Sequence, residues 1–300
     1  MDHVVERSPG RICLLGDNAD LIEKPALAAA VSAHITVTLN KRTDNTIIIN
    51  SSDIDEREIF NLQDLPPLTS PLRYPVAVIQ RLKADINTGF EAGISSEIPI
   101  SAGLSSSTAL VIAFIRAISR AYDIHFTPKE IAELSFTIES RDLGVECGRM
   151  DQYAIVFGGI SYMTTDDNAQ ATSLGTIDLP ILVADTQEKH DTKALQIWLR
   201  NRIAMKEDLL LGSLNRVVDI VEEGRKALEQ GDLNLLGSLM NSQQKEEKLM
   251  GTSTERLELL TGTAREAGAL GAKQMGAGGG GCIIALCTPE SVESVKTSLE

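Results

Sequence analysis

The first half of the chain contains several short runs of apolar residues that have the pattern of strands. Apolar and β-branched residues bounded by turn formers are typical of strands. They predict strands over 11–16, 26–39, 46–50, 89–98 and 160–164. The polar pair Asp44 and Asn45 separates the second run from the third and predicts a hairpin turn between them.

Other segments of the first half have the spacing of helices. Apolar residues predict a helix within 71–86, and the apolar run over 108–121, poor in Gly and Pro, predicts a mostly buried helix. Thr127, Pro128 and Glu130 form a strong helix start. The threonine can cap the first turn, proline suits the first position, and the glutamate can accept a hydrogen bond from the cap. This helix should run to about residue 141.

The second half begins after a polar break at 165–172, where we place a domain boundary that gives domains 1–166 and 167–300. A further apolar helix ends at Phe157, ahead of this break. Beyond it we expect a buried strand over 181–184, three or four helices between 192 and 268, and strands over 271–275 and 282–287. The chain stops at Glu300 inside a helix that starts near Pro289, so the second domain is either shortened or cut.

The composition restricts the class of protein. Three hundred residues, 43% hydrophobic and 23% charged, are enough for two globular domains. The net charge of −14 argues against nucleic acid and anionic membrane as partners, because both require clusters of Lys and Arg. The N-terminus is polar and the most apolar run is too short to span a bilayer, so we expect a cytoplasmic protein. Four cysteines without metal-binding spacing favour buried free thiols.

The loop between the strand at 89–98 and the helix at 108–121 is the first candidate for chemistry. It contains Gly103 and then Ser105, Ser106 and Ser107 at the start of the helix. The first N–H groups of a helix have no internal partner and carry positive potential, so a phosphate can bind there. Serines before a helix are also ordinary N-caps, and both interpretations remain open. The chain has no Gly-Lys-Ser/Thr P-loop.

A glycine run at 276–281 is the second candidate. Five of its six residues are glycine, which is costly in backbone entropy. Such a cost is tolerated where the backbone closely approaches a ligand or another segment. A flexible linker is the alternative, although the run lies between two predicted strands rather than between domains.

Carboxylates near turns and helix ends form the third group. Asp17 and Asp20 follow the first strand, where they are either turn formers or ligands of a polar small molecule. Glu139 and Asp151 could share a metal ion and a substrate, although two such carboxylates are commonly solvated surface residues.

Together these segments resemble the GHMP kinases, the family of galactokinase, homoserine kinase, mevalonate kinase and phosphomevalonate kinase. Residues 8–16 are similar to the first motif of the family, 99–110 to the second and 273–286 to the third, in the same order. The resemblance implies an α+β fold of two domains, an N-terminal domain like ribosomal protein S5 and a ferredoxin-like C-terminal domain. It also implies ATP, Mg²⁺ and phosphoryl transfer to a small alcohol.

The resemblance further implies roles for individual residues. Asp151 matches the catalytic aspartate, and Arg11 matches a basic residue that would stabilise the ionised aspartate and developing charge. Ser107 and Glu139 would hold Mg²⁺. Asp17, Asp20, Gly148 and Asp151 would contact the acceptor. The nucleotide would be bound by Pro99, Ser101, Ala102, Gly103, Leu104, Ser105, Ser106, Ser107, Gly276 and Gly278.

The acceptor is harder to predict, because the motifs are mixed. Arg11, Asp20 and the sequence Cys-Gly-Arg-Met-Asp-Gln at 147–152 are similar to galactokinases, whereas 24–30 and the four-glycine third motif are similar to mevalonate kinases. Since an acidic pair, Asp17 and Asp20, would repel the carboxylate of mevalonate, we expect the anomeric hydroxyl of a sugar to be the acceptor.

Two questions stay open beside the choice of acceptor. A non-catalytic sugar sensor is the alternative of another class, although sensing needs neither a metal ligand nor a base. The protein could be a monomer or a homodimer, because a dimer needs an exposed apolar face that the sequence does not reveal.

Overall fold

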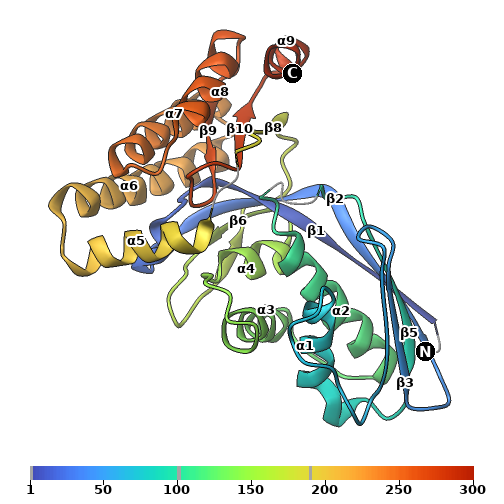
Figure 1. Cartoon of the computed structure of the whole chain (residues 1–300). Coiled ribbons are helices and arrows are strands. Elements are labelled where there is room, and N and C mark those ends of the chain that lie inside the picture. The colour runs from blue at the N-terminus through green and yellow to red at the C-terminus, as the bar shows by residue number, and fades with distance from the viewer. Residues whose placement is uncertain (1–2, 100–102, 189–190) are drawn as a thin grey trace. The chain divides into compact units, whose positions relative to one another are not determined.

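The computed structural model describes residues 3–99, 103–188 and 191–300 (Figure 1). Its contacts divide the chain into two compact units. The first unit comprises 1–11, 30–100 and 104–158, and the second comprises 12–29, 101–103 and 159–300. Two long strands, β1 (His3–Leu15) and β2 (Ala26–Lys41), contribute residues to both units.

The first unit contains a sheet in the order β4-β3-β5-β2, with β1 beside β2. Strand β5 is antiparallel to β2 and parallel to β3, and β4 is antiparallel to β3. The predicted strands at 46–50 and 89–98 are confirmed. The weakly alternating strand β4 was not predicted, because its exposed positions are more numerous than its apolar ones. The bounds are β3 (Thr46–Ser51), β4 (Glu56–Asn61) and β5 (Phe90–Ser96).

The expected hairpin between β2 and β3 is wrong, because β5 lies between these two strands. Ile47 of β3 is opposite Phe90 of β5, and Ile49 is opposite Ala92. All four side chains are fully buried, so the pairing places two apolar rows on one face of the sheet. The turn sequence predicts only that the chain reverses direction. Which strand pairs with β3 is determined by the burial of these apolar side chains.

The helices of the first unit pack around one central helix. They are α1 (Arg73–Leu82) with a 3₁₀ turn η2 (Lys83–Asp85), α2 (Ser106–Tyr122), α3 (Pro128–Thr137), a π-helical turn η3 (Ile138–Asp142) and α4 (Met150–Phe157). Helix α2 contacts α1, α3 and α4, which explains why it is apolar on nearly all sides (Figure 1). The capping box expected at Thr127 and Glu130 is present.

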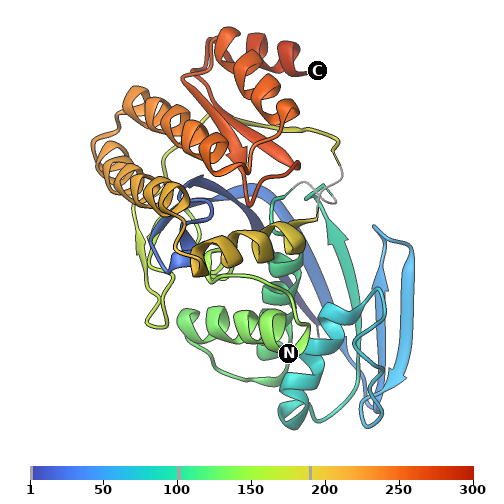
Figure 2. The ribbon, with the colours of Figure 1, turned by 60° about the vertical axis from the view of Figure 1, so that its left-hand side comes forward.

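The second unit contains an antiparallel sheet in the order β8-β10-β9. Helices α7 and α8 contact β9, and α9 contacts β8 (Figure 2). Apolar side chains of α8, α9 and the three strands form one core. The start of β2 pairs with β6, which pairs with β7. The bounds are η1 (Ala19–Ile22), β6 (Ile160–Met163), β7 (Ala171–Ser173), β8 (Ile181–Asp185), α5 (Thr192–Ala204), α6 (Asp208–Gln230), α7 (Leu233–Met250), α8 (Glu255–Glu266), β9 (Gly271–Met275), β10 (Cys282–Leu286) and α9 (Val292–Leu299).

Two sequence-based expectations about the whole chain can be compared with the described residues. The cysteines are free thiols, and Cys13, Cys282 and Cys287 are buried, as expected. Within residues 3–99, 103–188 and 191–300, every helix is too short or too polar to cross a lipid bilayer.

Candidate active site

Asp151 lies in the first turn of α4, where two side chains of the first unit bind its carboxylate. Arg11 Nε, from β1, donates to Oδ1 at 2.7 Å, and Ser105 Oγ donates to Oδ2 at 2.6 Å. The arginine side chain is 8% exposed and that of Asp151 is 24% exposed. The adjacent guanidinium forms a charge-assisted hydrogen bond with the carboxylate, and the exposed fraction leaves room for a substrate hydroxyl. The expected proximity of Arg11 and Asp151 is thus present.

Ser105 has an unusual backbone conformation at the start of α2. Its φ is +57°, in the left-handed region that favours glycine, and its side chain makes no capping hydrogen bond to the helix. The hydroxyl bonds to Asp151 instead. The ordinary N-cap interpretation is therefore wrong for this serine. The first N–H groups of α2 are left without its side-chain oxygen, which keeps this helix start suited to an anion.

Glu139 lies in the π-helical turn that follows α3, an irregularity often found at functional sites. Its carboxylate accepts hydrogen bonds from Thr108 Oγ1 at 3.0 Å, from Gln152 Nε2 at 2.7 Å and from the Ser107 hydroxyl. Burial raises the pKa of Glu139 to about 7, and the negative charge of Asp151 adds to this shift. The structure thus brings Ser107 and Glu139 together, as expected for a shared site.

The donor atoms around Glu139 fit a magnesium ion. Hydroxyl, carboxylate and amide oxygens are the ligands that Mg²⁺ prefers. The buried Oε1 of Gln152 has no hydrogen-bond partner among the described residues, so an oxygen ligand is available beside the carboxylate. A divalent cation would also offset the negative charge of Asp151, which adds to the effect of burial on the pKa of Glu139.

Asp17 lies in the second unit, in a setting that differs from the expected acceptor contact. It forms an ion pair with Lys273, and both side chains are 0% exposed. Oδ2 also accepts from Gln243 Nε2 at 3.1 Å, and Oδ1 accepts from the backbone N–H of Gly276 at 2.6 Å. Both oxygens therefore have protein partners and neither faces solvent.

Asp20 lies nearby in the chain, on the short helix η1, and it is half-buried. Leu21 and Ile22 of the same turn pack against apolar side chains of α5, α6 and α7. This packing anchors η1 in the second unit, so Asp20 stands on a fixed element.

The glycine run is a loop between neighbouring antiparallel strands, since Met275 of β9 is opposite Cys282 of β10. The linker interpretation is therefore wrong. A Cβ on Gly278 would lie 2.3 Å from the carbonyl oxygen of Thr252, so this position requires glycine. A Cβ on Gly103 would lie 3.3 Å from Cε of Met275, which places Gly103 beside the start of this loop within the second unit.

The other predicted site residues are placed as follows. Ser101 and Ala102 lie outside the described residues. Pro99 is exposed, Leu104 is buried, and Ser106 and Gly148 are half-buried. The carbonyl oxygen of Leu104 accepts from the backbone N–H of Arg11 at 3.0 Å, so the first and second motifs meet in the first unit. Their contacts with a nucleotide or an acceptor stay predictions.

Sequence reasoning missed the side chains that hold the predicted ones in place. Thr108 and Gln152 bind Glu139, and Lys273 and Gln243 bind Asp17. A signal existed for Lys273, because a charged residue within a buried strand usually has a partner of opposite charge. No local pattern pointed to Gln243, which lies on a helix far along the chain.

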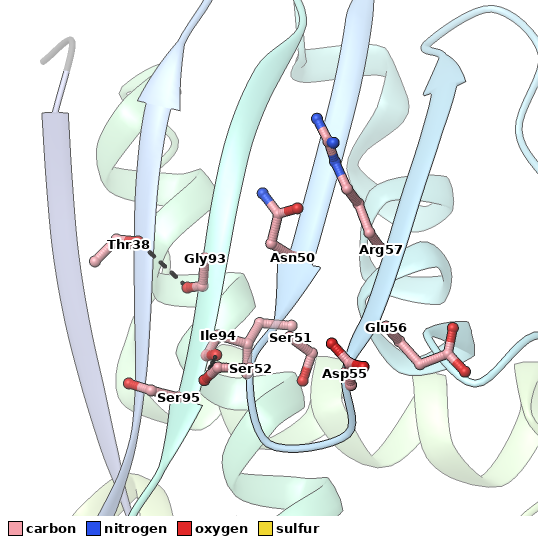
Figure 3. A pocket seen from close by; sticks show the side chains of 10 residues that line it. All are labelled: Thr38, Asn50, Ser51, Ser52, Asp55, Glu56, Arg57, Gly93, Ile94 and Ser95. Atoms are coloured by element: carbon pink, nitrogen blue, oxygen red, sulfur yellow. Dashed lines mark hydrogen bonds between the residues drawn. The ribbon is translucent and has the colours of Figure 1, made fainter.

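A separate hollow of about 490 Å³ lies on the first unit and shares no residue with the motifs (Figure 3). It is lined by the turn between β3 and β4 and by β5, with Asp55, Glu56 and Arg57 among its side chains. Charges of both signs lie around it, so it has no clear preference for an anion or a cation.

Comparison with known proteins now decides the family. The model described as "GHMP kinases N terminal domain" matches residues 73–159, and the one described as "GHMP kinases C terminal" matches 225–300. A mevalonate kinase from Thermococcus sibiricus is 32% identical and covers 99% of this chain and 92% of its own length. The chain belongs to the GHMP kinase family. It is a phosphotransferase with an alcohol acceptor and has the fold of two domains that was expected.

Further relatives of this GHMP kinase differ in their named substrates. A galactokinase from Pyrococcus furiosus is 26% identical and covers 100% of this chain and 93% of its own length. The crystal structure of the Methanococcus jannaschii mevalonate kinase is 25% identical, with a TM-score of 0.84, over 99% of this chain and 94% of that one. As a GHMP kinase, the protein is an ATP-dependent enzyme that binds a small-molecule substrate.

Proposed function

We propose that this GHMP kinase transfers the γ-phosphoryl group of Mg²⁺-bound ATP to a hydroxyl group of mevalonate. The observation that carries the catalytic part is the Asp151 carboxylate, bound by Arg11 and Ser105 and still partly exposed. The relatives named mevalonate kinase, at up to 32% identity over nearly the whole chain, support the choice of acceptor.

The burial of Asp17 also bears on this choice. An acidic pair of Asp17 and Asp20 beside the acceptor would repel the carboxylate of mevalonate and so favour a sugar. Asp17 is neutralised by Lys273 and has no exposed side-chain surface, so it contributes little repulsion. Asp20 alone remains of the pair, and one half-buried carboxylate is a weaker argument.

In this proposal each catalytic side chain has a role that its contacts support. Asp151 orients the acceptor hydroxyl and accepts its proton, while Arg11 holds the carboxylate in place. Ser107 and Glu139 would hold Mg²⁺, with Gln152 and Thr108 fixing the carboxylate. The bound cation would neutralise charge on the phosphates. The start of α2 offers backbone N–H groups to the phosphates, since phosphoryl transfer depends mainly on positioning and charge stabilisation.

A sugar kinase is the second candidate, and a specific observation favours it. Asp20 is fixed on η1 and is a suitable acceptor for two vicinal hydroxyls of a sugar. The sequence 147–152 and the galactokinase relative at 26% identity agree with this candidate.

Assays of ADP release with Mg-ATP and a panel of acceptors distinguish a mevalonate kinase from a sugar kinase. We expect the highest kcat/KM with mevalonate and little turnover with galactose or other hexoses. A higher kcat/KM with a hexose would replace mevalonate by a sugar as the acceptor. Turnover with phosphomevalonate but with neither mevalonate nor a sugar would also contradict the proposal.

A further inference from the structure

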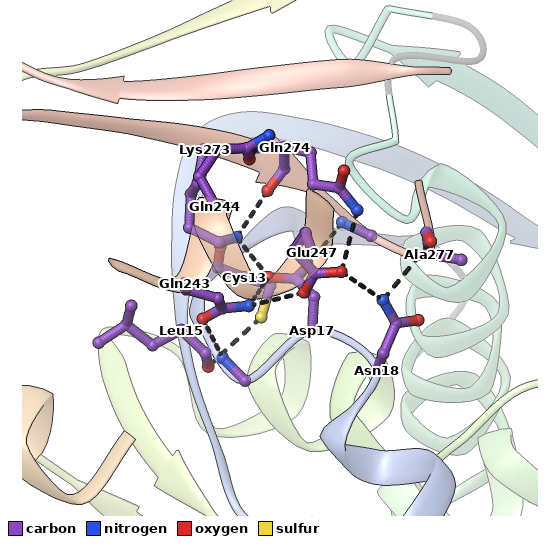
Figure 4. Close-up of polar contacts among 12 residues, drawn as sticks. Cys13, Leu15, Asp17, Asn18, Gln243, Gln244, Glu247, Lys273, Gln274 and Ala277 are labelled. Carbon is purple, nitrogen blue, oxygen red and sulfur yellow. Dashed lines mark hydrogen bonds and ion pairs between the residues drawn. The ribbon is translucent and has the colours of Figure 1, made fainter. Parts of the chain in front are cut away.

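The second unit encloses a cluster of polar side chains that the proposed reaction does not use. This buried polar cluster consists of Asp17, Asn18, Gln243, Glu247, Lys273 and Gln274, none of which is more than 6% exposed (Figure 4). Its members come from the turn after β1, from α7 and from β9. Polar groups are buried at such density only when they bind one another, and this cluster is extensively hydrogen-bonded.

The ion pair at the centre of the cluster joins three segments. Lys273 on β9 binds Asp17 after β1 and also donates to the carbonyl oxygen of Gln274 at 2.6 Å. Gln243 on α7 donates to Asp17 Oδ2 and accepts from the backbone N–H of Gly16 at 2.9 Å. The charged pair therefore fixes the end of the first motif against the strand that leads into the glycine-rich loop, residues 276–281.

The other oxygen of Asp17 holds the loop itself. Oδ1 accepts the backbone N–H of Gly276 at 2.6 Å, at the first residue of the loop. Two more contacts continue along it, from Asn18 Nδ2 to the carbonyl oxygen of Ala277 at 3.5 Å and from Gly279 N–H to that of Thr252 at 2.7 Å. Because the N–H of Gly276 is already bound to Asp17, a contact between Gly276 and a phosphate would have to use another atom of this residue, and the predicted nucleotide contact of Gly276 stays a prediction.

We propose that Asp17 and Lys273 are positioning residues, which hold the glycine-rich loop in the conformation that meets the nucleotide phosphates. This proposal rests on the proposed function for the identity of the ligand. A loop of five glycines has many conformations when free, and binding would have to order it. The carboxylate, itself held by Lys273 and Gln243, keeps the first residue of the loop ordered before the nucleotide arrives.

Substitutions can separate an ion pair that only stabilises the fold from one that also positions the loop. Replacing a buried ion pair by apolar groups of similar size is often neutral for stability, whereas removing one partner leaves an unpaired charge. Double substitutions at both positions can therefore retain the fold, and the group at position 17 can then be varied separately. Asn and Leu have similar shapes, but only Asn has an oxygen that can accept the N–H of Gly276.

The test compares the variants D17N/K273M and D17L/K273M in the full chain. We expect both to fold, and D17L/K273M to bind ADP about tenfold more weakly than D17N/K273M in calorimetric titrations, the effect of one lost hydrogen bond on an ordered loop. In turnover assays its KM for ATP should rise while kcat changes much less. Peptides covering 275–282 should exchange amide hydrogen faster in the leucine variant, whereas peptides from α2 should not.

Several outcomes would overturn the proposal. Equal ADP affinity and equal loop exchange in the two double variants would reduce the pair to a structural contact. If D17L/K273M does not fold, the test is the hydrogen-exchange rate of the Gly276 amide in the wild-type protein. Exchange at the rate of an unstructured peptide would contradict the hydrogen bond from this amide to Asp17. Measurements of ADP affinity and of amide hydrogen exchange need no acceptor. They therefore test this proposal even if mevalonate is not the acceptor.

Discussion

At the scale of single residues, the structure separates carboxylates that resemble one another in the sequence. Asp151 is partly exposed and bound at both oxygens by side chains of the first unit, whereas Asp17 is completely buried and paired with a lysine. Burial and partners therefore separate two aspartates that were both predicted to contact the acceptor. Glu139 differs again, because its buried carboxylate is surrounded by oxygen and amide groups rather than by a cation.

The first residue-scale prediction concerns Asp151. Replacing it by asparagine removes the proton acceptor but retains similar shape, so kcat should fall by roughly 10³-fold. The affinity for ADP should stay within about twofold of the wild type, since the carboxylate is not expected to contact the nucleotide. Steady-state kinetics measure kcat, and calorimetry measures the affinity for ADP. Asp44→Asn, at an exposed turn, is the matched control. Unchanged turnover in Asp151→Asn would remove Asp151 from the mechanism.

At Ser105 the backbone conformation affects stability, whereas the side-chain hydroxyl affects turnover, so substitutions can separate the two effects. Ser105→Gly should be more stable than Ser105→Ala by about 1 kcal/mol, since glycine adopts the positive φ without strain. Both variants lose the hydroxyl that binds Asp151, so both should show a similarly reduced kcat. Urea denaturation measures the difference in unfolding free energy between the two variants, and steady-state assays measure kcat for each. If the glycine variant retained full activity while the alanine variant did not, the bond from Ser105 to Asp151 would be unimportant for catalysis.

At the scale of elements, local sequence signals predicted helix starts well and strand partners poorly. The capping box at Thr127 is formed as its residues predict, because both bonds join groups three positions apart. The hairpin between β2 and β3 was expected from an equally local signal, but β5 pairs with both strands. The π-helical turn carrying Glu139 was not predicted, since its extra residue leaves the apolar pattern of α3 nearly unchanged.

The capping box gives the element-scale prediction. Thr127→Ala removes the side chain that accepts the N–H of Glu130, and it should cost about 1 kcal/mol of unfolding free energy. Thr127→Ser keeps the hydroxyl and should lose much less. Urea denaturation of the two variants beside the wild type measures the difference. Equal losses in both would mean that the threonine methyl group, rather than the cap, provides the stability.

At the scale of the whole molecule, buried ionisable groups connect stability to pH. Burial raises the pKa of Glu247 to about 7, and the charge of Asp17 adds to this increase. The folded state therefore binds a proton that the unfolded state, with a carboxyl pKa near 4.5, has already released. Stability is lost as the pH rises from the unfolded to the folded value, because the folded state binds more protons in that window.

This linkage gives the whole-molecule prediction. Between about pH 5 and about pH 8, Glu247 alone should lower the unfolding free energy by about 3 kcal/mol, because each tenfold difference in proton affinity between the two states corresponds to about 1.4 kcal/mol. Glu247→Gln removes the titrating group and should flatten the dependence by about that amount. Urea denaturation at the two pH values measures the slope for each protein. A slope unchanged in Glu247→Gln would show that other groups cause the dependence.

The order of motifs, most strands and helices and the membership of the GHMP kinases followed from the sequence alone. The strands and helices rest on local spacing, such as apolar periodicity and a capping box, whereas the family rests on the resemblance of residues 8–16, 99–110 and 273–286 to its motifs. Only the tertiary structure decided that Asp17 is buried with Lys273, that Ser105 binds Asp151, and that β5 separates β2 from β3. Such contacts join residues as far apart as Asp17 and Lys273, 256 positions along the chain, and depend on which surfaces become buried together.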